Sequence, residues 1–243
     1  MPEIIRSREQ LTPRLLEILS LFPNSNYPMT MIYQPERVLL SRQISKLVPT
    51  DPGKTLDVGG GDGSRYRNYF NTLDFTSLDI DPTTNPDVLA SAADMPFMDS
   101  EFDTLLSSQV LEHVLSPHDC MNEMYRVLKS GGYLVLTVPQ QNEMHSEPID
   151  YWRFTKFGVL QLANESNFEV ISILQRGGYH ACRAQLRIRK WVDSYNPYQN
   201  PRKMIFLGQL TKYYTKVALW IDARFTSEAG NKNALGWCLL LRK

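Results

Sequence analysis

The 243-residue sequence has few cysteines and no excess of charge of either sign. Its three cysteines lie far apart and form no C-x-x-C pair, so we expect no disulfide framework, no metal site and a reducing cytoplasm. Basic and acidic residues number 26 each, which removes any overall attraction to nucleic acid. No run approaches the ~18–20 uncharged residues of a membrane span, and the first residues lack the apolar core of a signal peptide.

The most informative stretch covers residues 55–64 and reads Thr-Leu-Asp-Val-Gly-Gly-Gly-Asp-Gly-Ser. A short apolar run that breaks into glycines is typical of a buried strand that turns sharply into a helix. Glycine permits the backbone dihedrals of such a turn and lets a ligand approach, and the N–H groups that start the helix would face that ligand. The stretch therefore predicts a cofactor loop after a strand over 55–58, the alternative being an ordinary glycine-rich turn.

Two cofactor classes use loops of this kind. A dinucleotide loop requires Gly-x-Gly-x-x-Gly, in which Gly59 and Gly61 fit but the sixth position is Ser64. The spacing acid-x-Gly-x-Gly-x-Gly is complete in Asp57, Gly59, Gly61 and Gly63. This second spacing resembles the first motif of the class I S-adenosylmethionine-dependent methyltransferases. The resemblance implies that these four residues bind S-adenosylmethionine.

A second strand is expected over 75–78, and Asp79 at its end lies twenty positions after Gly59. An acid at this place can accept hydrogen bonds from both ribose hydroxyls of a nucleoside, whether in NAD or in S-adenosylmethionine. We therefore expect Asp79 and the adjacent Ile80 to bind the cofactor. A loop or helix-capping aspartate is the alternative.

The next motif surrounds Asp94 and resembles the family's adenine motif. The resemblance implies that Asp94 accepts a hydrogen bond from the exocyclic amine and that Met95 packs on the ring. A fourth strand is expected over 102–109. Ser108 and Gln109 then lie at its carboxyl end, where ligands of open α/β sheets bind.

Further along, Leu-Glu-His at 111–113, a capped helix and an apolar strand over 133–138 again resemble the family. Four consecutive motifs over roughly 54–176 resemble its methyltransferase type 11-like branch, and their joint order is more specific than any one of them. Strands alternating with helices predict an α/β fold with a parallel sheet. The resemblance implies a Rossmann-like seven-stranded sheet, mostly parallel with the last strand antiparallel, and helices on both faces.

The chain is expected to divide into an N-terminal helical segment over 1–50 and a methyltransferase domain over 51–243. Within that domain, 183–222 is expected to be a helical insertion before the last strand. Its part from 183 to 216 holds eight basic residues and one acid, so it carries +7 and the remainder of the chain −7. Such a segment could hold an anionic acceptor, contact an anionic membrane surface or be a solvated face.

If the acceptor is a hydroxyl, a base must take its proton. His113 and His145 both follow expected strand ends on the cofactor side and are the candidate catalytic residues, although either could equally be a histidine without a catalytic role.

The block 150–155, Asp-Tyr-Trp-Arg-Phe-Thr, resembles one associated with methyltransferases of glycan and natural-product assembly. Asp150, Tyr151 and Arg153 are therefore candidate substrate-binding residues. A brace for the loop, in which Asp150 pairs with Arg153, is the equal alternative.

Together these features predict a methyltransferase that uses S-adenosylmethionine as its cofactor. The expected acceptor is a small molecule, at a hydroxyl of a sugar, glycan or natural-product intermediate. A non-catalytic S-adenosylmethionine-binding or scaffold protein is the alternative from another class. A nucleic-acid methyltransferase is a third, disfavoured by the neutral net charge and favoured by the basic segment.

Overall fold

The computed structural model describes residues 32–197, 200–225, 230 and 232–243. The chain divides into two compact units. We call 40–176 with 235–243 the sheet unit, and the described residues of 1–39 and 177–234 the hairpin unit. Most of the expected N-terminal helical segment lies outside the described residues, and the predicted domain boundaries stay predictions. No helix among the described residues has both the length and the apolar character needed to cross a membrane.

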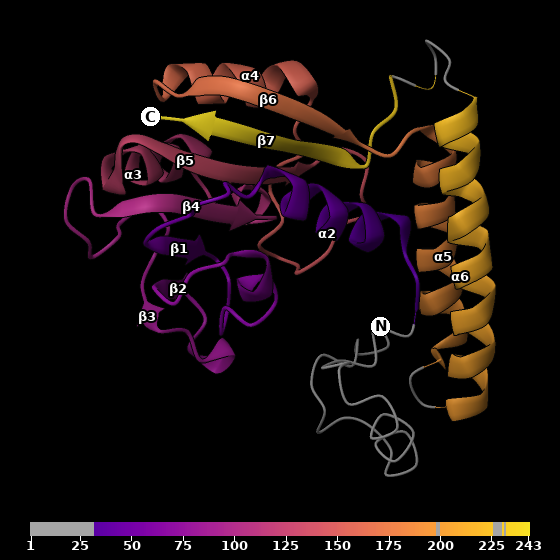
Figure 1. Cartoon of the computed structure of the whole chain (residues 1–243). Coiled ribbons are helices and arrows are strands. Elements are labelled where there is room, and N and C mark those ends of the chain that lie inside the picture. Colours follow the sequence, from indigo (N-terminus) through magenta and orange to yellow (C-terminus); the bar gives the residue numbers. More distant parts are fainter. Residues whose placement is uncertain (1–31, 198–199, 226–229, 231) are drawn as a thin grey trace. The chain divides into compact units, whose positions relative to one another are not determined.

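The sheet unit contains a seven-stranded sheet with the order β3-β2-β1-β4-β5-β7-β6 (Figure 1). Its strands are β1 (Thr55–Val58), β2 (Phe75–Asp79), β3 (Val88–Leu89), β4 (Phe102–Ser108), β5 (Leu128–Pro139), β6 (Glu169–Arg176) and β7 (Gly236–Arg242). Only β7 is antiparallel to its neighbours, β5 and β6. The predicted Rossmann-like fold class is confirmed.

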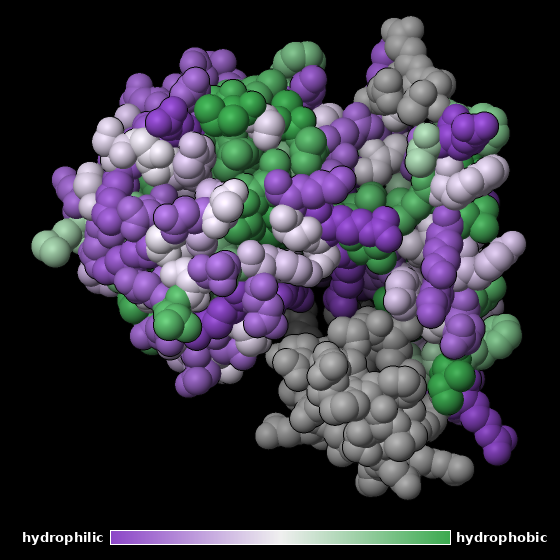
Figure 2. Space-filling model, viewed as in Figure 1, coloured by the Kyte–Doolittle hydropathy of each residue, from purple (hydrophilic) through white to green (hydrophobic). Residues whose placement is uncertain are grey.

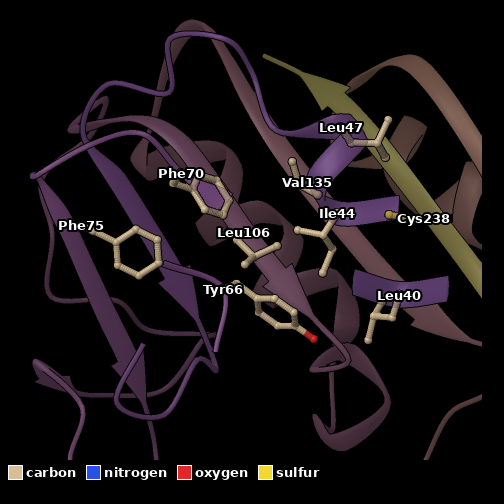
Figure 3. Close-up of a cluster of buried hydrophobic side chains, with 9 residues drawn as sticks. All are labelled: Leu40, Ile44, Leu47, Tyr66, Phe70, Phe75, Leu106, Val135 and Cys238. Carbon is tan, nitrogen blue, oxygen red and sulfur yellow. The ribbon is translucent and has the colours of Figure 1, made fainter. Parts of the chain in front are cut away.

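Three α-helices accompany these strands: α2 (Pro35–Leu47), α3 (Pro117–Val127) and α4 (Lys156–Glu165). Helices α3 and α4 begin where they do because the hydroxyls of Ser116 and Thr155 accept hydrogen bonds from N–H groups in the first turn. The spacing of Leu40, Ile44 and Leu47 puts all three on one side of α2. Figure 3 shows them in the buried cluster that includes strand residues of β4, β5 and β7.

The prediction of a helix after the glycine loop is wrong. Residues 61–66 form turns, and only a 3-10 helix, Arg67–Tyr69, follows them. The connection from β2 to β3 is likewise a 3-10 helix, Pro82–Thr84, so strands and α-helices do not alternate through this half of the sheet. Tyr66 and Phe70 of this segment are both buried in the core.

The strand expected over 133–138 is also longer than predicted. Helix α3 ends at Val127 and the chain enters β5 directly at Leu128. The Ser-Gly-Gly sequence at 130–132 therefore lies inside the strand. Gly131 has a φ of 80°, and the pairing of β4 with β5 shifts register between Phe102 and Thr104.

The hairpin unit contains α5 (Tyr179–Tyr195) and α6 (Pro201–Arg224). Its core consists of Ile32, Ile188, Val192, Met204 and Leu207. The Asp222 carboxylate of α6 accepts hydrogen bonds from the N–H groups of Gly178, His180 and Ala181, at 2.8–3.0 Å, and so satisfies the free donors that begin α5. Both helices overlap the helical insertion expected over 183–222, although α5 begins four residues earlier than that range.

Candidate functional site

The glycine loop after β1 has the geometry that its sequence predicted. Gly59, Gly61 and Gly63 all have positive φ, from 59° to 70°, which other residues resist. The N–H group of Gly59 donates to the Leu78 carbonyl at 2.7 Å and so ties the loop to the end of β2. A Cβ at Gly60 would overlap the Asp57 carboxylate. The loop can therefore lie directly over Asp57 only because it consists of glycine at these positions.

The Asp57 side chain is almost completely buried beneath this loop, with 1% of its surface exposed. Burial raises its pKa to about 8, and the nearby Arg65 guanidinium opposes that rise only in part. Its Oδ2 atom has no hydrogen-bond partner among the residues that the structure describes. A buried carboxyl oxygen without a partner costs folding free energy, and a cationic ligand group beside it would offset that cost.

The Asp79 carboxylate contacts the same loop. Its Oδ2 atom accepts a hydrogen bond from the Gly61 N–H at 2.9 Å, and Oδ1 accepts one from the Asp81 N–H at 3.0 Å. A carboxylate has about four acceptor sites, so both oxygens retain capacity for a ligand. The next residue, Ile80, is 70% exposed. The structure thus brings the Asp79 carboxylate to the glycine loop.

The adenine-motif residues differ in exposure. Asp94 is exposed, whereas the Met95 side chain is buried. The Met95 N–H donates to the Glu123 carboxylate at 2.9 Å, and its carbonyl accepts from Arg126 at 3.0 Å. Helix α3 therefore holds this segment through the ion pair of Glu123 and Arg126. The sequence alone did not identify this pair.

Ser108 and Gln109 lie at the carboxyl end of β4, as predicted. Thr137 of β5 joins them, because its hydroxyl contacts both the Ser108 hydroxyl and the Gln109 amide at 3.2 Å. Gln109 has a φ of 59°, a conformation that residues other than glycine rarely adopt. The polar side chains of two neighbouring strands thus form one hydrogen-bonded group at this edge of the sheet.

Arg176, the last residue of β6, completes this edge. Its side chain is fully buried, and Nη2 donates to the Gln109 side chain at 3.3 Å and to the Val138 carbonyl at 3.0 Å. Nε and Nη1 have no partner in the described part of the chain. Sequence reasoning missed this residue, because its contacts come from strands that are distant in sequence.

The two candidate bases, His113 and His145, are in contact. The rings of His113 and His145 pack edge to face, with their centroids 4.9 Å apart. The Nδ1 atom of His113 lies 2.6 Å from the Ile149 carbonyl, which assigns the proton to Nδ1 and leaves the lone pair on Nε2. Burial lowers the pKa of His113, with the Ile149 carbonyl opposing. His113 is therefore neutral at physiological pH and able to accept a proton.

Asp150 and Arg153 pair with each other. Both Asp150 oxygens accept from Arg153 at 2.7 Å, and this hydrogen bonding lowers the pKa of Asp150 to about 2. Arg153 also donates to the Glu143 carbonyl at 2.8 Å, and Asp150 accepts from the His145 N–H at 2.9 Å. The pair braces the loop that carries His145. Tyr151, which is 45% exposed, is the most exposed of the three candidate substrate-binding residues.

Glu112 was not singled out from the sequence. It is fully buried beside the two histidines, and its carbonyl accepts from the Tyr151 N–H at 2.8 Å. Glu112, His113 and His145 offer one ligand atom each within 4.8 Å of one another, so they could together hold a divalent ion. The residues next to Glu112 in the sequence do not predict this cluster, because His145 reaches it from the loop after β5.

These features define a class of protein. A seven-stranded sheet with β7 antiparallel between β5 and β6, a glycine loop after β1 and an acid after β2 form the fold of the class I methyltransferases. Residues 56–136 match the family model Methyltransf_11, which is described as a methyltransferase domain. The chain thus has the class I methyltransferase fold, and its residues 56–136 match a methyltransferase domain.

Individual relatives match different shares of the chain. An uncharacterised protein of Methanocaldococcus jannaschii is 28% identical over 177 residues, 67% of this chain and 79% of that protein. An uncharacterised methyltransferase of Mycobacterium tuberculosis is 38% identical over 104 residues, 35% of this chain but only 39% of its own length. In fold, the chain is similar to phosphoethanolamine N-methyltransferase 2 of Haemonchus contortus, which was solved with S-adenosyl-L-methionine. The TM-score is 0.53 at 14% sequence identity, and the match covers 84% of this chain and 52% of that one.

Proposed function

We propose that this protein transfers a methyl group from S-adenosylmethionine to a small-molecule acceptor, at a hydroxyl of a sugar, glycan or natural-product intermediate. The observation that carries the proposal is the buried Asp57 carboxyl oxygen without a partner, lying under a glycine loop that Asp79 also contacts. This arrangement fits a ligand with an ammonium group and a ribose. S-adenosylmethionine has both, and it supplies an electrophilic methyl group.

In this proposal Asp57 receives the ammonium group through the loop or through water, and Asp79 accepts from the ribose hydroxyls. Asp94, Met95 and Ile80 surround the adenine, while Ser108 and Gln109 border the site at the end of β4. The main contribution of the chain is then to hold the acceptor oxygen at reactive distance from the methyl carbon. Such orientation can supply ~7–11 kcal/mol of the barrier.

His113 is the proposed general base. Its Nδ1 proton is held by the Ile149 carbonyl, so that Nε2 can take the hydroxyl proton as the oxygen attacks. His145 packs against the His113 ring and orients it. Two nitrogen atoms of the Arg176 guanidinium, Nε and Nη1, have no partner among the residues that the structure describes, which favours an acceptor that bears an anionic group. Tyr151 and the Asp150–Arg153 pair would border that acceptor.

The test combines calorimetry with a labelled-methyl assay. We expect the full chain to bind S-adenosylhomocysteine and to transfer label to sugar or phenol hydroxyls, with or without EDTA. No binding would overturn the cofactor assignment, and binding without transfer to any acceptor would favour a scaffold. Transfer to a polynucleotide at low salt would instead make it a nucleic-acid enzyme. Transfer that EDTA abolishes would assign His113 and His145 to a metal rather than to proton transfer.

Cofactor affinity is expected to depend on pH through Asp57. Its folded pKa of about 8 lies above the usual value of 3.8, so the protonated form adds stability at acidic pH and this stability is lost as pH rises through about 8. An ammonium ligand needs the ionised form. The affinity for S-adenosylhomocysteine should therefore rise by up to about tenfold per pH unit below pH ~8.

Calorimetry between pH ~6 and ~8.5 measures this dependence, with proton release on binding as a second readout. Asp57→Asn is the matched variant, since it keeps the shape and cannot ionise. It should bind weakly with an affinity that does not change with pH. Equal slopes for both proteins would show that Asp57 does not titrate with binding.

A further inference from the structure

Helix α6 has an apolar stripe on its exposed side. Phe206, Tyr213 and Trp220 follow at seven-residue intervals and are 71%, 71% and 60% exposed. Leu210 and Val217 lie between them at helical spacing, so all five residues share one face. The opposite face packs against α5. Among the described residues, Trp220 packs edge to face on Phe225 with ring centroids 5.9 Å apart, yet all three aromatic side chains of the stripe stay exposed. A large exposed aromatic stripe marks an interaction site.

Basic residues border this stripe. Arg202, Lys203, Lys216 and Arg224 are all exposed and lie within the same half of α6 by helical spacing. The only acid of α6, Asp222, is on the other side, where it satisfies the N–H groups that begin α5. Figure 2 shows hydrophobic and hydrophilic side chains next to each other over α6. Aromatic residues with a basic border are the composition of helices that lie in a membrane interface.

A small cavity adjoins the stripe. It has a volume of about 140 Å³ and is lined by His180, Arg183 and Arg187 of α5 and by Tyr214, Val217, Ala218 and Ile221 of α6. Val217 belongs to both the cavity and the stripe. The cavity is below the ~300 Å³ of a drug-sized site, but its basic lining suits a phosphate group.

The two arginines of this cavity keep their positive charge uncompensated. Arg183 donates to the Tyr179 hydroxyl and Arg187 to the Tyr214 hydroxyl, both at 3.3 Å. Neither forms an ion pair with an acid among the residues that the structure describes. Because a neutral hydroxyl does not cancel a charge, both guanidinium groups can attract an anion placed between them.

We propose that the α5–α6 hairpin docks on a membrane surface that contains anionic phospholipid, with a headgroup phosphate between Arg183 and Arg187 and the stripe of α6 in the interface. Charge complementarity selects this occupant, since the segment 183–216 carries +7. Tyrosine and tryptophan are the side chains that favour the boundary between headgroups and acyl chains. The proposal concerns the hairpin alone and does not depend on methyl transfer.

The experiment mixes the full chain with vesicles of phosphatidylcholine, with or without about 30% phosphatidylglycerol, and follows co-sedimentation and tryptophan emission. We expect binding at least tenfold tighter to the anionic vesicles, weakened by salt, with a blue shift that Trp220→Phe removes. Equal binding to both vesicles, or binding to neither, would overturn the proposal.

Two pairs of variants locate the surface. Arg183→Gln with Arg187→Gln should lower vesicle affinity at least tenfold, whereas Arg42→Gln with Lys46→Gln removes the same charge from exposed positions of α2 at the same spacing and should change it little. Phe206→Ser should weaken binding, and Phe157→Ser, at a 77% exposed position of α4, should not. If the Phe206 variant instead abolished self-association seen by light scattering, with vesicle binding unchanged, the stripe would be an interface between copies and the proposal would fail.

Discussion

Replacing His113 by alanine is expected to lower kcat by about 10²–10⁴ while leaving the dissociation constant of S-adenosylhomocysteine unchanged. The reason is that Nε2 of His113 carries a lone pair on a ring that is oriented by a hydrogen bond, from Nδ1 to the Ile149 carbonyl, and kept neutral by burial. Its lowered pKa adds a second expectation. At saturating cofactor, kcat should rise with pH through a midpoint below 6.5 and then level off at neutrality.

His118 provides the control for this prediction. It lies on α3, where Nε2 contacts the Glu165 carboxylate at 2.9 Å, and alanine there should leave kcat unchanged. His145→Ala should have a smaller effect than His113→Ala, because His145 only orients the other ring. An unchanged kcat for His113→Ala would mean that the acceptor needs no protein base. A loss of cofactor binding together with kcat would point to local unfolding instead.

Replacing Asp79 by alanine is expected to weaken S-adenosylhomocysteine binding by about 100-fold or more. Hydrogen bonds to a charged acceptor each contribute ~1.5–3 kcal/mol, and two ribose hydroxyls would lose theirs. The Gly61 N–H would also lose its partner at 2.9 Å, which loosens the glycine loop. Calorimetry measures the change directly, without any knowledge of the acceptor.

Two further variants separate these contributions. Asp79→Asn can still accept from Gly61 but lacks the negative charge, so it should fall between wild type and alanine. Asp74→Ala changes an exposed acid immediately before β2, at the opposite end of the same strand, and should bind as wild type does. Wild-type affinity in Asp79→Ala would remove the ribose role of Asp79 and with it the main support for the cofactor assignment.

The strand ends were predictable because they depend on local composition. Apolar runs that end in glycine or an acid located β1, β2 and β4 to within a residue, and the caps Ser116 and Thr155 located the starts of α3 and α4. The antiparallel position of β7 between β5 and β6, by contrast, came from the family resemblance. The pairing of strands that are distant in sequence cannot be predicted from the residues of any one strand.

What the sequence did not predict depends on contacts across the chain. Glu112 and Arg176 are both fully buried, and burial of a charged residue cannot be read from its neighbours in sequence. The helix expected after the glycine loop is absent, and Tyr66 and Phe70 of that segment pack in the core with residues of β2, β4 and α2. The insertion expected over 183–222 begins four residues after the start of α5, whose buried face around Ile188 and Val192 forms only by packing with α6.

The pairing of β6 with β7 has a consequence for how the domain can vary. Arg176 and Gly236 face each other across that pairing, and the Leu235 N–H donates to the Arg176 carbonyl at 2.8 Å. The chain thus departs toward α5 and returns from α6 at a single rung of the ladder. Because closing a loop costs only ~0.6 kcal/mol more for each doubling of its length, sequences of very different size can be exchanged at this point without shifting a strand.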